Sequence, residues 1–126
     1  MLRCDEIREI CDECRALQHV PGVFPYYLTE HAQPRTRALH YCGTAVEIGA
    51  IATAAITGNA WWLLLALVGG YGFAWVGHFF VEKNRPATFT YPLWSWIADH
   101  HMAWLALTGR LDARLRAAKA AHSMEK

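Results

Sequence analysis

Hydrophobic and polar positions divide the chain into a charged beginning, a long apolar middle and a basic end. Between Glu47 and Glu82 there is no Asp, Glu, Lys or Arg. A membrane-spanning helix needs about 20 apolar residues, so this stretch is too long for one simple span and too short for two unless the first begins upstream. The turn-forming segment Thr57 to Ala60 divides it. The pattern therefore predicts a helical hairpin of two spans, Ala38 to Thr57 and Ala60 to Val81.

This hairpin places two histidines at the same depth. His40 lies 18 residues before Gly58, and His78 lies 19 residues after Asn59. Because each helical residue advances by about 1.5 Å, antiparallel helices hold both histidines near the end where the chain enters and leaves the hairpin. Each helix should carry a polar stripe on its inner side. The stripes are His40, Gly43 and Glu47 on the first helix, and Tyr71, Trp75, His78 and Glu82 on the second.

The segments outside the hairpin predict shorter elements. Apolar residues at helical spacing favour an amphipathic helix over Leu2 to Gln18. Prolines within Pro21 to Pro25 indicate a break, followed by a polar approach to the membrane over Tyr26 to Pro34. Leu111 to Ala121 is typical of a basic amphipathic tail on an anionic membrane surface.

A third apolar helix is expected over Leu93 to Thr108, since Pro92 suits a first helical turn. It contains Asp99, His100 and His101, so it is either a third span with an inward polar face or a helix lying in the membrane interface. The predicted fold class is all-α. The predicted organisation is an amphipathic N-terminal helix at 1–20, a membrane domain at 21–108 and a basic tail at 109–126.

Composition agrees with a membrane protein. The chain has 126 residues, which indicates one domain, and 54% hydrophobic residues with six tryptophans is rich for a soluble protein. The net charge of +1 without a basic stripe argues against a nucleic-acid partner. Five acidic residues within the first 20 argue against a secretory signal, so the hairpin itself should direct insertion: Asp5, Glu6, Glu9, Asp12 and Glu13.

Basic residues predict the orientation, because they flank the hairpin and are missing from its Thr57 to Ala60 turn. Both termini should be cytoplasmic, in the inner membrane of a bacterium or the endoplasmic reticulum of a eukaryote. The cysteines would then face a reducing compartment. Cys11 and Cys14 form a CxxC pair, which could be a thiol pair or half a zinc site; we interpret it as part of an apolar helix face.

Histidines and carboxylates near the hairpin form a stock of metal ligands. The set comprises His31, His40, His78 and Glu82, with Glu47, Asp99, His100 and His101 in reserve. Three histidines, or two with a carboxylate, suit a mononuclear non-haem Fe(II) centre with open positions. Each histidine alone is better explained as an interfacial or hydrogen-bonded residue. Jointly they favour a metal site, since ionisable residues at membrane depth are usually functional. His19 and His122 should be solvated.

Two motifs resemble those of a known family. The spacings are His31-x8-His40-x2-Gly43 and Gly77-His78-x3-Glu82-x3-Pro86-Ala87. They resemble a family of small membrane proteins, long catalogued as a domain of unknown function, whose characterised fungal member is an Fe(II)-dependent 2-hydroxy fatty acid dioxygenase. The stretch from Tyr71 to Ser95 looks like the family's short bacterial branch. The resemblance covers about Tyr27 to Met102, and the N-terminal CxxC helix lies outside it.

The resemblance implies oxygen-dependent removal of one carbon from a 2-hydroxy fatty acid, with O₂ as co-substrate and Fe(II) as cofactor. It makes His31, His40 and His78 the expected ligands. Glu82 would be a fourth ligand or the acceptor that fixes a histidine tautomer. Arg85 would pair with the substrate carboxylate or anchor the chain at the membrane surface.

Two other classes compete with this reading. One is a membrane protein that binds lipid or a protein partner without catalysis, and it should purify without stoichiometric iron. The other is a membrane di-iron hydroxylase or desaturase, which needs a larger set of histidines in His-x-x-His boxes. This chain has seven histidines and no such box. A homo-oligomer is compatible with the sequence.

Overall fold

The computed structural model describes residues 20–124, and the regular secondary structure of this part of the chain is all helical. Its elements in chain order are α2 (Val20–Glu30), α3 (Pro34–Thr57), α4 (Trp61–Val76), the π-helix η1 (Gly77–Glu82), the 3₁₀ turn η2 (Ala87–Phe89), α5 (Pro92–Leu107) and α6 (Leu111–Met124). The predicted helix over Leu2 to Gln18, the Cys11 and Cys14 pair and His19 lie outside the described residues.

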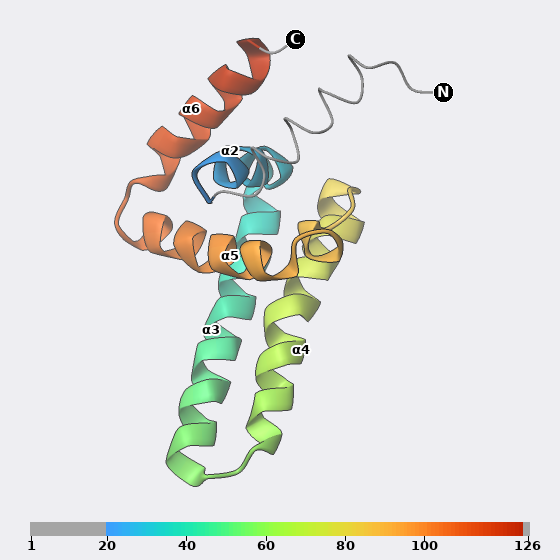
Figure 1. Cartoon of the computed structure of the whole chain (residues 1–126), viewed down its shortest axis with the longest axis vertical. Helices are drawn as coiled ribbons and strands as arrows, with labels where there is room; N and C mark the ends of the chain where they lie inside the picture. Colours follow the sequence, from blue (N-terminus) through green and yellow to red (C-terminus); the bar gives the residue numbers. More distant parts are fainter. Residues whose placement is uncertain (1–19, 125–126) are drawn as a thin grey trace.

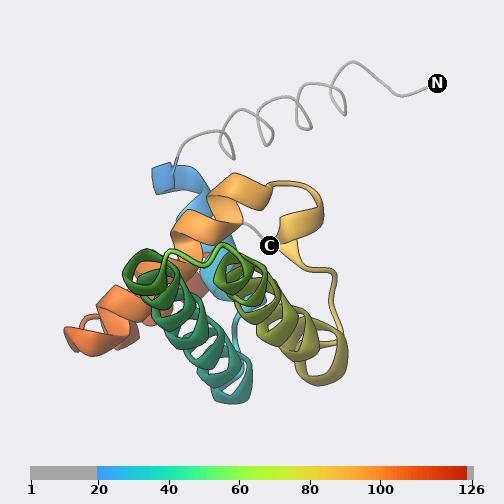
Figure 2. The same ribbon diagram turned by 90° about the horizontal axis from the view of Figure 1, so that it is seen from below.

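Helices α3 and α4 run antiparallel, side by side, and form the predicted hairpin (Figures 1 and 2). Two helical segments are long and apolar enough to cross a membrane, Pro34–Thr57 and the continuous run Trp61–Glu82. Helix α3 begins four residues earlier than predicted, because Pro34 suits a first helical position. The turn at Gly58 has the expected chemistry: Gly58 adopts φ +67°, and its N–H donates to the Ala54 carbonyl at 2.9 Å.

Glycines let the two hairpin helices approach closely. A Cβ atom added to Gly43 on α3 would lie 2.9 Å from the Gly69 carbonyl oxygen of α4, whereas one added to Gly49 would meet nothing within 4 Å. Small residues at such crossings are what membrane helices pack through. The contact at Gly43 therefore holds the two helices in register near the end that carries the histidines.

We expect Gly43→Ala to destabilise the hairpin by roughly 1–3 kcal/mol, the usual cost of overpacking. The matched variant Gly49→Ala, on the same helix, should be neutral or stabilising by up to about 1 kcal/mol, since alanine is the better helix former. Equilibrium unfolding of both variants in detergent measures the difference. Equal stabilities would mean that the helices are not held together at Gly43.

Helix α2 corrects one prediction. The expected break at Pro21 to Pro25 is wrong, since Val20–Glu30 is a single helix with Pro25 inside it, and this helix includes the first part of the predicted polar approach over Tyr26 to Pro34. Pro25 removes one backbone hydrogen bond from this helix without ending it. The helix also buries an apolar stripe that the prolines obscured in the sequence. Its members, at helical spacing, are Phe24, Tyr27, Leu28 and, in the following turn, His31.

Helix α5 lies across the open end of the hairpin, the end opposite the turn (Figure 1). Its 16 residues begin at Pro92, close to the predicted start. The crossing orientation favours the interfacial alternative over a third span. Its buried face joins α2 and α6 in one apolar core, whose members are Phe24, Tyr27, Leu28, Ala98, Met102, Leu105, Leu111, Leu115 and Ala118. Helix α6, the predicted tail, leads away from the hairpin (Figure 1).

Candidate metal centre

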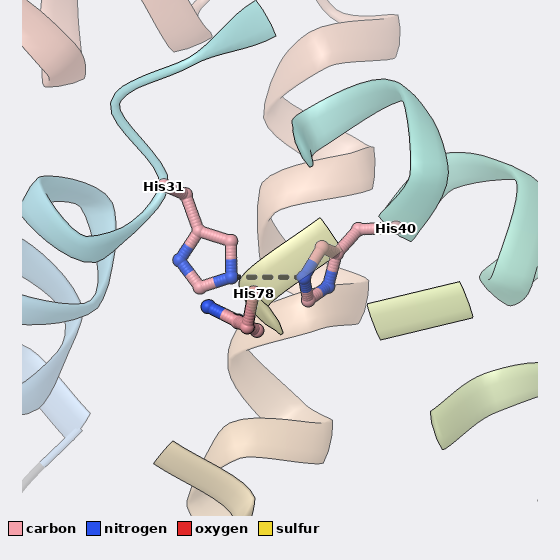
Figure 3. Close-up of side chains that lie close together, drawn as sticks. All are labelled: His31, His40 and His78. Atoms are coloured by element: carbon pink, nitrogen blue, oxygen red, sulfur yellow. Dashed lines mark hydrogen bonds between the residues drawn. The ribbon is translucent and has the colours of Figure 1, made fainter. Parts of the chain in front are cut away.

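Three histidines from three segments meet at the open end of the hairpin. His31 lies in the turn after α2, His40 on α3 and His78 on η1, and at most 3% of any of the three is exposed. Their ring centroids are 4.4 Å (His31 to His40), 4.5 Å (His31 to His78) and 5.2 Å (His40 to His78) apart. Figure 3 shows the rings gathered in one group, and their potential ligand atoms all lie within 4.8 Å of one another. This group could hold a metal ion.

Local structure positions the histidine rings. Arg37 Nη1 donates to the His31 and Ala32 carbonyl oxygens, both at 2.9 Å, and so fixes the turn that carries His31. His78 lies on a π-helix, where the sequence predicted a continuous α-helix to Val81. Single π turns recur at functional sites. Gly77 allows this turn to contact α3, because a Cβ atom there would lie 3.1 Å from Thr36 Cγ2.

The outer nitrogen of every ring has a partner. Nδ1 of His31 lies 2.6 Å from the Tyr27 carbonyl oxygen, Nδ1 of His40 lies 2.8 Å from Asp99 Oδ1, and Nδ1 of His78 lies 2.7 Å from Asn84 Oδ1. The Asn84 amide is oriented by its nitrogen, which donates to Glu30 Oε2 at 2.8 Å. A carbonyl, a carboxylate and an amide oxygen all accept, so each Nδ1 carries the ring proton. Each Nε2 is therefore left with a lone pair.

Two of these Nε2 atoms lie close together. Nε2 of His31 and Nε2 of His40 are 3.0 Å apart, the contact drawn as a dashed line in Figure 3. With both protons held on the Nδ1 atoms, this contact has no hydrogen to share, and two facing lone pairs repel. A cation between them removes the repulsion. Burial and the neighbouring His40 and His78 hold the pKa of His31 well below its usual value, so His31 is neutral and able to ligate at neutral pH.

Asp99 supports the group from α5. Its Oδ1 atom accepts from His40 Nδ1 and also from the Tyr27 hydroxyl, and Asp99 is buried. Burial and the Asp99 charge raise the pKa of Tyr27 well above its usual value, so the hydroxyl stays protonated and donates. A carboxylate behind a metal-ligating histidine fixes its tautomer. Asp99 was predicted only as a reserve ligand, and its role as the acceptor behind His40 was not predicted, although Asp99 shares a buried stripe with Ser95 and Met102.

Glu82 and Arg85 lie outside the converging group. Glu82 Oε1 accepts from the Gln33 backbone N–H at 2.7 Å, which ties η1 to the start of α3. Glu82 was expected to be a ligand or the acceptor behind a histidine. Asp99 accepts from His40 and Asn84 accepts from His78 instead. Arg85 is exposed, and its guanidinium carbon lies 5.5 Å from the centre of the Phe89 ring.

The reserve residues have separate partners. Glu47 is buried on α3 and accepts from Trp96 Nε1 at 2.5 Å, with His100 Nε2 at 3.8 Å. His101 stacks on Phe24, with ring centroids 4.3 Å apart. His122 is exposed on α6, as predicted.

One buried hydroxyl near the histidines has no protein partner. Among the described residues, Thr36 Oγ1 is buried and makes no hydrogen bond. Thr36 lies one helical turn before His40 and contacts Gly77, the neighbour of His78. A buried donor of this kind is normally satisfied by a bound water or ligand. The residues present thus fit a metal ion together with a further bound group.

The fold and the site together define a class of protein. It is all-helical, with a hairpin long enough to cross a membrane and a buried group of three histidines. The chain belongs to the Mpo1-like family, since the family model described as "2-hydroxy-palmitic acid dioxygenase Mpo1-like" matches residues 17–111. That stretch includes the hairpin and all three histidines. The family resemblance found in the sequence is thereby confirmed. No curated protein and no solved structure matches the chain significantly.

Proposed function

We propose that this protein is an Fe(II)-dependent dioxygenase that shortens 2-hydroxy fatty acids by one carbon. The observation that carries the proposal is the convergence of three buried histidines, whose potential ligand atoms lie within 4.8 Å of one another and whose Nδ1 atoms each lie beside an acceptor. The family description supports the substrate class. The balanced reaction converts a 2-hydroxy acid and O₂ into the acid one carbon shorter, CO₂ and water, so the overall conversion needs no external reductant.

His31, His40 and His78 would hold the iron. Three histidines that leave further coordination positions open suit a mononuclear non-haem Fe(II) centre. Fe(II) bound there supplies a Lewis acid and an electron source for O₂.

The chain's own residues have distinct tasks in this proposal. The Tyr27 carbonyl oxygen, Asp99 and Asn84 hold the imidazole protons outward, and burial keeps bulk water from the histidines. Glu82 acts as a positioning residue through its bond to Gln33. Arg85 pairs with the substrate carboxylate, for which its planar guanidinium offers two parallel hydrogen bonds.

The protein is proposed to be integral to a membrane, with α3 and the Trp61–Glu82 run as its spans. This places the alkyl chain of the substrate at the depth of the bilayer's hydrocarbon region and both termini on the cytoplasmic side, since the basic residues flank the hairpin. With the native thiols replaced, a cysteine at Asn59 should react with an impermeant reagent in intact cells, and one at Ser123 should not. Labelling of Ser123 would contradict this orientation.

The function is tested by oxygen consumption and iron analysis of the detergent-purified protein. We expect stoichiometric iron and O₂ uptake with a 2-hydroxy fatty acid. The matching acid without the hydroxyl should be turned over poorly, because it lacks the second oxygen that can chelate iron. Equal turnover of both acids would contradict chelation. Protein free of iron and inactive with both would favour the lipid-binding alternative.

A further inference from the structure

An apolar pocket of about 430 Å³ lies between α3, α4 and the first half of α5. Its walls include Ile51 from α3, Leu63 and Leu67 from α4 and Leu93 from α5. Its volume is in the range of ordinary small-molecule sites. We call this pocket the hairpin groove. Its apolar walls belong to the part of the hairpin that is long and apolar enough to be embedded in a bilayer.

One end of the hairpin groove is polar. Glu47 and Tyr71 line this end, together with the indole of Trp96. The Glu47 carboxylate is engaged by α5, since Oε1 accepts from Trp96 Nε1 and Oε2 lies 3.8 Å from His100. Gly70 makes room for it, because a Cβ atom there would lie 2.9 Å from Glu47 Oε2. The groove therefore has a polar end beside α5 and an apolar end toward the turn, the polarity of a single-chain amphiphile.

The polar end of the hairpin groove is the end nearer to the histidines, as the spacing along α3 and along α4 with η1 shows. Glu47 follows His40 by seven residues on α3, and Tyr71 precedes His78 by seven residues. Seven helical residues span about 10 Å. The groove thus begins about 10 Å from the metal ligands and continues toward the turn. A second pocket, of about 390 Å³, is lined by α3 and α5 alone and shares no wall with the helical run that carries His78.

We propose that the hairpin groove binds the distal part of the substrate's alkyl chain and selects 2-hydroxy acids long enough to reach it. This inference rests on the proposed function, in which the acid and hydroxyl groups of the substrate lie at the histidines. The alkyl chain of a short acid ends before the groove, so contacts in the groove add nothing to its binding free energy. A long chain places its last methylene groups against Ala66 and Leu67, where each buried methylene contributes about 0.8 kcal/mol of binding free energy.

Two variants obstruct the groove, and one serves as the control. Ala66→Phe fills its middle, and Leu63→Trp closes the end nearest the turn, at a position that is already half exposed. The control Ala45→Phe adds the same bulk to the second pocket, between α3 and α5. Equilibrium binding of 2-hydroxyhexadecanoic and 2-hydroxyoctanoic acid is measured without oxygen, so that no turnover occurs. The same preparations are then assayed for O₂ uptake.

Ala66→Phe should weaken binding of the long acid by about tenfold or more and leave the short acid unchanged. Leu63→Trp should weaken binding of the long acid less than Ala66→Phe does, and Ala45→Phe should change the binding of neither acid. Unchanged long-chain binding in both groove variants, or an equal loss in Ala45→Phe, would overturn the proposal while O₂ uptake still upheld the dioxygenase. Selective loss of long-chain binding in a protein that consumes no O₂ would uphold the groove and reject the dioxygenase.

Discussion

Alanine at His40 or at His78 is expected to remove the bound iron and to abolish oxygen consumption with 2-hydroxy fatty acids. Each substitution removes one of the three converging histidines, and two histidines alone hold iron weakly. Loss of an outer partner typically costs tenfold to a hundredfold in metal affinity, so loss of a ligand should cost more than about a hundredfold. Metal analysis of the purified variants and an oxygen electrode give the two measurements.

The fold should survive these substitutions, because hairpin insertion depends on apolar length and internal backbone bonding and not on these side chains. Circular dichroism of the purified variants checks this. His122→Ala is the matched control, since His122 is exposed on α6. A His78→Ala protein that keeps both its iron and its turnover would refute the ligand assignment.

Asp99→Asn should lower iron affinity by roughly tenfold to a hundredfold while leaving the three ligands in place. The carboxylate accepts two donors at Oδ1, the Tyr27 hydroxyl and His40 Nδ1. A neutral amide accepts more weakly, and if its nitrogen faces His40 it favours the tautomer that protonates Nε2. Competition with a chelator measures the affinity.

Two companion variants separate this effect from a general loss of stability. Tyr27→Phe removes one donor but leaves Asp99 bonded to His40, so its loss of affinity should be smaller. Asp112→Asn removes an exposed carboxylate on α6 and should change nothing. Wild-type iron affinity in Asp99→Asn would show that the carboxylate does not set the His40 tautomer.

The sequence predicted the hairpin and the meeting of His40 with His78, because apolar length and the turn at Gly58 together set the depth of every residue in both helices. The polar stripe on the second helix was only partly right. Trp75 is exposed and stacks on Phe89, with ring centroids 5.3 Å apart. The i→i+5 bonding of η1 widens the turn, so Glu82 is displaced relative to His78 and bonds to Gln33.

Other parts of the site carried weaker signals. His31 was counted among the candidate ligands, but its position could not be derived, since it depends on a helix whose prolines indicated a break. The role of Asp99 depends on how α5 crosses the hairpin, and a crossing angle is a tertiary property that no local spacing encodes. The π turn at Gly77 has no reliable sequence pattern.

The crossing of α5 also sets the order in which the centre can be completed. His31, His40 and His78 are made before residue 99, so a nascent chain that ends after η1 contains all three histidines but not the carboxylate that bonds to His40 Nδ1. If the three histidines hold iron as proposed, tight binding should begin only after α5 has been synthesised and has docked. A chain truncated after η1 should then bind iron weakly, and iron retention should mark a completed fold.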